Sequence, residues 1–133
     1  MACNVTITAK NGSNIKLKQV ATIIDVNTFE ENLKRNSGEK IATITIKGGI
    51  LHDDIQSSID LFKWSHDFSE DGVYRTVKIE ECTESSSITQ TFEFKEVFVI
   101  RYIENLDEKY DKSAFVLTLR QKEGNLTNNS KNY

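Results

Sequence analysis

The chain has 133 residues, of which 38% are hydrophobic and 28% charged, and its formal net charge is −3. This length suits one hydrophobic core, and the composition is that of a folded domain rather than a disordered chain. The small negative charge argues against a general binder of the nucleic-acid backbone, because such binding depends on many Lys and Arg side chains. No apolar run approaches the roughly 18 residues that span a bilayer, so we expect no nucleic-acid partner and no membrane insertion.

The N-terminal segment and the cysteines favour the cytoplasm. Residues 1–10 alternate apolar and polar side chains and lack the continuous apolar run of a signal peptide. Cys3 and Cys82 are too few to cross-link a domain of this size, and neither belongs to a CxxC pair. We interpret both as small packing residues in a reducing compartment.

The first apolar segments have a period of two, which predicts strands. Val5 and Ile7 alternate with threonines until a turn at residues 11–13, and a second strand follows over residues 15–24 with one change of phase. Proline, which often protects sheet edges, is absent from the chain. We therefore take the strand carrying Val5 and Ile7 as a candidate edge for self-assembly.

Residues 27–47 contain one ambiguous segment and one clear strand. Thr28 and Glu31 match a capping box, so residues 27–36 form either a short helix or a long ordered loop. Residues 40–47 alternate cleanly and end at two glycines, which predicts a strand with one face exposed to water.

The period changes to that of a helix at about residues 53–67. The apolar side chains form two adjacent stripes, Ile55, Ile59 and Phe62 in one and Leu61, Trp64 and Phe68 in the other. An aromatic ligand platform is conceivable, but helical spacing beside a leucine favours the core for all three aromatic residues. We expect one helix that covers the core.

Four further strands are predicted at residues 73–83, 88–95, 97–103 and 115–120. Both phases of 97–103 are apolar, which indicates a strand buried on two faces, with the helix as its cover. The sum is a mainly β fold, a two-sheet barrel or sandwich of about seven strands with one flanking helix. Residues 1–122 form the single domain, and the polar residues 123–133 form a flexible tail.

The period-two pattern also defines a polar sheet face. Its members are Thr43, Thr45, Lys47, Thr76, Lys78, Glu80, Thr89, Thr91, Glu93, Lys95, Thr118 and Arg120. This face is either an ordinary solvated surface or the continuous wall of a wide pore.

Residues suited to catalysis are few. His52 and His66 are the only histidines, and neither has ligand spacing of the HExxH kind. No GxSxG, Walker or GxGxxG motif follows a strand, and no cysteine has the setting that activates a thiol. We predict that the chain is not an enzyme and has no catalytic, metal-binding or cofactor-binding residues.

The order of the motifs resembles a known family. It consists of the helix with Leu61-Phe62-Lys63-Trp64-Ser65, then Val73-Tyr74-Arg75-Thr76-Val77-Lys78-Ile79, then residues 92–102 (FEFKEVFVIRY), and last residues 115–122 (FVLTLRQK). This order resembles tube proteins of contractile injection systems, including the haemolysin-coregulated protein (Hcp) of type VI secretion. It looks closest to a family of Firmicutes proteins labelled membrane-associated protease, although no protease motif is present here. The resemblance covers residues 39–122.

The resemblance implies a barrel that forms hexameric rings, which stack into a tube with the polar face toward the lumen. It also implies sheath, spike or effector proteins as partners and possible export as part of the apparatus. In the family a loop contacts the next ring, and residues 26–38 do not match that loop. The alternatives are a monomeric β-sandwich module that binds a peptide or carbohydrate, and a small enzyme with an unfamiliar site.

Overall fold

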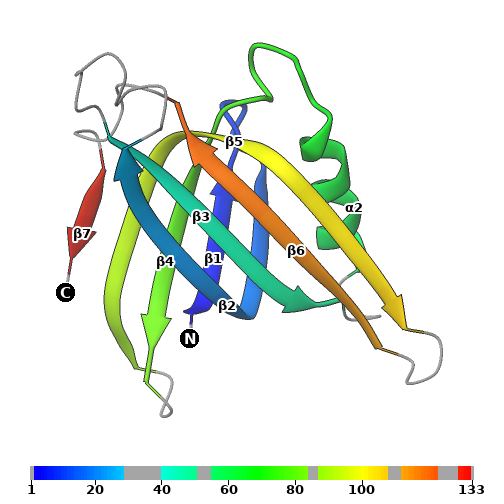
Figure 1. Ribbon diagram of the computed structural model, residues 1–133, viewed down its shortest axis with the longest axis horizontal. Helices are drawn as coiled ribbons and strands as arrows, with labels where there is room; N and C mark the ends of the chain where they lie inside the picture. Colours follow the sequence, from blue (N-terminus) through cyan, green and yellow to red (C-terminus); the bar gives the residue numbers. More distant parts are fainter. Residues whose placement is uncertain are drawn as a thin grey trace.

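A computed structural model describes residues 2–28, 40–50, 55–83, 87–107, 112–122 and 129–132. Its elements are β1 (Ala2–Thr8), β2 (Asn14–Thr28), β3 (Lys40–Gly49), α2 (Ile55–Ser65), β4 (Arg75–Cys82), β5 (Ile88–Asp107), β6 (Lys112–Gln121) and β7 (Ser130–Asn132). The strands form one antiparallel sheet in the order β4-β1-β2-β3-β6-β5-β7, and a further pairing of β4 with β5 closes it into a barrel (Figure 1). The predicted mainly β fold with a flanking helix is confirmed.

Two long strands bend and divide the barrel into two walls. Residues 14–20 of β2 pair with β1, whereas residues 21–28 pair with β3. Residues 88–97 of β5 pair with β4, and residues 97–107 pair with β6. Each strand changes partner beside a residue with positive φ, Gln19 at 53° and Glu96 at 56°. Such bulges bend a strand and form the corners of a barrel.

We call these halves the β1 wall and the β3 wall. The β1 wall consists of β1, β4, residues 14–20 of β2, residues 88–97 of β5, and β7. The β3 wall consists of β3, β6, residues 21–28 of β2 and residues 97–107 of β5. The core lies between them and contains Val5, Ile7, Ile15, Leu17, Val20, Ala42, Ile44, Ile46, Leu61, Trp64, Val77, Ile79, Phe94, Val97, Phe115, Leu117 and Leu119.

The hairpin between β1 and β2 turns where the sequence predicts. Gly12 has a φ of +89°, which side chains disfavour, and its amide donates a hydrogen bond to the carbonyl of Ala9 at 2.9 Å. The side-chain oxygen of Asn11 accepts a hydrogen bond from the amide of Ser13 at 2.9 Å.

Several strand boundaries differ from the prediction. The two strands expected at 88–95 and 97–103 are one strand, β5, because the bulge at Glu96 bends the chain without ending its pairing. Asn27 and Thr28 continue β2, so a helix starting at residue 27 is wrong, and residues 29–39 lie outside the described part of the chain. Ser130–Asn132 pair with β5, so this end of the predicted flexible tail belongs to the sheet.

The helix buries a narrower face than its apolar pattern suggests. Leu61 and Trp64 are buried, but Phe62 is 57% exposed and Phe68 87% exposed. Ile55 and Ile59, from the same predicted stripe as Phe62, are also exposed. The placement of Phe62 and Phe68 in the core is therefore wrong. The helix α2 packs against β2 and β5 with the face that carries Leu61 and Trp64, and Phe68 lies beyond the end of α2 at Ser65.

Gly48 and Gly49 provide a test of packing where β3 passes the core. A Cβ atom on Gly48 would lie 2.8 Å from Val20 Cγ1 and 2.9 Å from Phe115 Cε1, whereas the nearest atom to one on Gly49 is 3.9 Å away. We expect Gly48→Ala to destabilise the fold by about 1–3 kcal/mol through overpacking. Gly49→Ala is the matched control and should change stability little. Equal urea midpoints for the two variants would contradict this account.

Candidate assembly surface

The structure divides the predicted polar face between the two walls. Thr43 lies opposite Arg120 and Thr45 opposite Thr118 on the β3 wall, and these residues alternate with fully buried neighbours such as Ile44. Cross-strand partners share a face, so this group forms one outer surface. Lys47 continues the group along β3.

The remaining members belong to the β1 wall. Lys78 lies opposite Glu93 and Glu80 opposite Thr91, and Lys78 lies between the fully buried Val77 and Ile79. Thr76 and Lys95 extend this group, while the side chain of Thr89 lies outside the described structure. Since the core separates the walls, the two groups point away from each other, and one central hole can be lined by only one of them.

The prediction that the strand carrying Val5 and Ile7 is a sheet edge is wrong. β1 pairs with β2 on one side and with β4 on the other, and both side chains are fully buried. The alternation that suggested an edge strand belongs to a central strand whose other face is polar. A proline at either position would therefore disrupt the barrel itself.

The β3 wall has edge strands at both ends instead. Among the described residues, 21–28 of β2 pair only with β3, and 98–107 of β5 pair only with β6. By contrast, β7 covers part of the corresponding edge of the β1 wall by pairing with residues 91–93 of β5. Strand edges of this kind are where a sheet can continue into another chain.

Exposed apolar side chains mark the same edges. Ile23 on β2 is 59% exposed and faces outward beside Thr45, and Ile100 on β5 is 41% exposed at a bulge. Val26 is also exposed. Sequence analysis missed these residues, because apolar side chains in both phases of a strand were interpreted as burial on two faces. Ile100 shows that this interpretation of residues 97–103 is wrong.

Hydrogen bonds and a cation–π contact connect both ends of α2 to the rest of the chain. The Trp64 indole donates to the carbonyl of Val73 at 3.1 Å, and the Arg75 guanidinium lies 5.3 Å from the centre of the indole ring. Ser58 donates to Glu104 at 3.0 Å, as does the hydroxyl of Tyr102 at 2.6 Å. Burial, followed by the hydrogen bond to Glu104, raises the pKa of Tyr102.

Asp67 forms an ion pair with Arg75 of β4, and the pKa of its carboxyl group is lowered. Hydrogen bonds from the side chain and the backbone amide of Ser69 lower the pKa of Asp67, and Arg75, 3.7 Å away, lowers it further. A lowered folded-state pKa contributes stability above the unfolded value of about 3.9 that disappears as pH falls through the folded value. We expect Asp67→Asn to lower the melting temperature at pH 7 and not at pH 2. A gap that persists unchanged at pH 2 would show that the charge contributes nothing.

The residues considered for chemistry are dispersed. His66 is exposed and packs edge-on against Phe62, with 4.8 Å between the ring centres. His52 lies outside the described residues. The described residues contain no group of three or more His, Cys, Asp or Glu side chains that could hold a metal ion, and no helix able to cross a membrane. Cys82 forms a disulfide bond, so its interpretation as a simple packing residue is wrong.

The chain shares its fold with Hcp proteins and with components of extracellular contractile injection systems. The chain is similar to Hcp1 from E. coli EAEC 042, with a TM-score of 0.65, 12% identity, and coverage of 97% of this chain and 96% of that one. It is similar to Hcp1 from Flavobacterium johnsoniae, with a TM-score of 0.50, 16% identity, and coverage of 97% and 99%. A third similar structure is the PVC sheath–tube complex of an extracellular contractile injection system, with a TM-score of 0.54, 12% identity, and coverage of 98% and 88%. No protein-family model and no curated protein matches the sequence.

Proposed function

We propose that this chain is an inner-tube protein of a contractile injection system, a structural subunit that closes into rings of six and stacks into a tube. The observation that supports the proposal most directly is the β3 wall, a four-stranded sheet with a polar outer face and an edge strand at each end. Joining residues 21–28 of β2 in one copy to residues 98–107 of β5 in the next continues the sheet around a ring.

In this ring the lumen is lined by the β3-wall group, which contains Thr43, Thr45, Lys47, Thr118 and Arg120. The β1-wall group, Thr76, Lys78, Glu80, Thr91, Glu93 and Lys95, then faces away from the lumen. The sequence assigned both groups to one lumen-lining face, whereas the proposal assigns only the β3-wall group to the lumen. The hydroxyl groups and cations of the lining suit a water-filled passage for effectors, and the outside of the tube would meet sheath and spike proteins.

The proposal assigns the chain a structural role and no catalytic activity. Its relation to the family labelled membrane-associated protease is supported only by the motif order in the sequence. We further propose synthesis in the cytoplasm and export as part of the apparatus. The disulfide at Cys82 fits exposure to oxidising surroundings at some stage, since disulfides persist there.

The deciding experiment is the solution mass of the purified chain at low and high concentration, followed by negative-stain imaging of species larger than a monomer. Rings or tubes with a central hole are expected. A strict monomer at every concentration would overturn the proposal and favour the monomeric binding module.

A further inference from the structure

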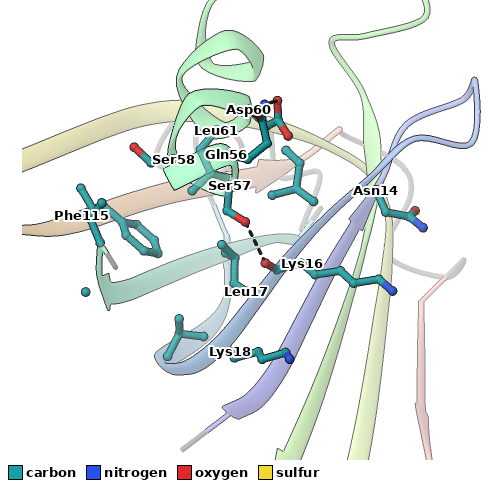
Figure 2. A pocket seen from close by; sticks show the side chains of 14 residues that line it. Asn14, Lys16, Leu17, Lys18, Gln56, Ser57, Ser58, Asp60, Leu61 and Phe115 are labelled. Carbon is teal, nitrogen blue, oxygen red and sulfur yellow. Dashed lines mark hydrogen bonds between the residues drawn. The ribbon is translucent and has the colours of Figure 1, made fainter. Parts of the chain in front are cut away.

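A groove of about 570 Å³ separates α2 from residues 14–20 of β2 (Figure 2). It exists because β3, which pairs with the second half of β2, ends at Gly49, and α2 begins only at Ile55. Among the described residues, only β1 pairs with this half of β2. The groove therefore runs beside a strand edge, and its volume is within the range of about 300–1,000 Å³ typical of ligand sites.

The backbone of this edge points into the groove. The carbonyl of Lys16 accepts a hydrogen bond from the Ser57 hydroxyl of α2 at 3.1 Å, so it points away from β1. In an antiparallel ladder the amide and carbonyl of one residue point the same way, and residues two apart repeat the direction. The amide of Lys16 and the corresponding groups of Lys18 are therefore directed toward the groove. An added strand would replace the Ser57 hydroxyl as the donor to the Lys16 carbonyl.

The side chains define what would fit beside this edge. The floor is apolar and includes Leu17, Leu61 and Phe115, all buried. Lys16 and Lys18 are exposed on the outer face of the same half-strand, and both belong to the groove. On the helix side the Asp60 carboxylate accepts a hydrogen bond from the Gln56 amide at 2.9 Å. The charged residues of the groove are therefore two lysines and one aspartate whose carboxylate is already hydrogen-bonded, so the net charge of the groove is positive.

We propose that this groove binds an extended acidic segment of a partner protein, which adds to residues 14–20 of β2 as a further strand. Successive side chains of an added strand point to opposite faces. Alternate apolar side chains would rest on the floor, and the acidic side chains between them would lie beside Lys16 and Lys18. The proposal does not depend on ring formation, because no residue that lines the groove belongs to the two edge segments of the β3 wall, residues 21–28 and 98–107.

The probe is a fluorescein-labelled peptide of eight alternating valine and glutamate residues, added to the full-length chain and followed by fluorescence anisotropy. Saturable binding is expected. Lys16→Glu with Lys18→Glu should weaken it at least tenfold. The matched control is Lys10→Glu with Lys40→Glu, which makes the same charge change at exposed lysines outside the groove and should leave affinity within twofold.

Two further peptides test strand addition itself. One is N-methylated at every valine and the other at every glutamate, so each lacks the amide donors of one edge only. A strand pairing with β2 should lose at least tenfold in affinity with one of them and little with the other. Equal losses with both peptides, no binding of the parent peptide, or equal effects of the two lysine pairs would overturn the proposal.

Discussion

Replacing Ile23 by aspartate is expected to convert the proposed rings into monomers without unfolding the subunit. Ile23 is 59% exposed in the subunit and lies on the β2 edge strand of the β3 wall, outside the core, so its substitution removes no core contact. In the ring it would be covered by the next copy. Burying such a side chain contributes about 1.5–3 kcal/mol, so its loss should weaken each contact about tenfold to a hundredfold. Burying a carboxylate in its place adds to the effect.

Ile100→Asp should do the same from the opposite edge, on β5. The matched control is Ile55→Asp on α2, where an isoleucine that is 55% exposed lies away from both edges and an acid suits the start of a helix. The measurement is the oligomer distribution by analytical ultracentrifugation, with melting temperatures of the monomers alongside. Rings that persist in both edge variants, or that are lost equally in the control, would show that the subunits join elsewhere.

Much of the fold follows from local pattern because one face of each wall is buried. Alternation along β1, β3 and β6 places Ile7, Ile44 and Leu117 in the core, and the turn at Gly12 lies where the polar residues predict it. These features depend on neighbours in sequence and on the two-residue period of a strand.

The errors arise where pairing between distant strands decides the outcome. Whether β1 is central or at an edge depends on its ladder with β4, about seventy positions away, and nothing near Val5 encodes it. Glu96 and Gln19 adopt positive φ without being glycine, so the sequence carries no mark of the bends that turn β2 and β5 from one wall to the other. Those bends also separate the polar groups that sequence alone assigned to one face.

The buried face of the helix also depends on contacts with residues that are distant in sequence. Its apolar residues cover more than half of its circumference, and periodicity cannot say which part meets the barrel. In the structure Leu61 and Trp64 point inward and the stripe of Ile55, Ile59 and Phe62 points outward. Only the position of α2 against β2 and β5 selects between the two.

Trp64→Ala is expected to give the largest loss of stability of any single change on the helix. Trp64 is 2% exposed, packs within the core, donates to the carbonyl of Val73 and lies under the guanidinium of Arg75. Truncating a buried tryptophan costs about 3–5 kcal/mol, because the cavity is not refilled by its neighbours. In a domain of this size that should lower the melting temperature by roughly 10 °C or more.

Phe68→Ala is the matched control, because the sequence places both aromatic residues on one apolar stripe while the structure leaves Phe68 87% exposed. Its effect should stay within about 0.5 kcal/mol. Trp64→Phe should fall between the two, since it keeps an aromatic ring in the core but leaves the Val73 carbonyl without the indole donor. Urea unfolding of the three variants as monomers measures this order, and a loss at Phe68 as large as that at Trp64 would contradict the exposed position of Phe68 beyond the end of α2.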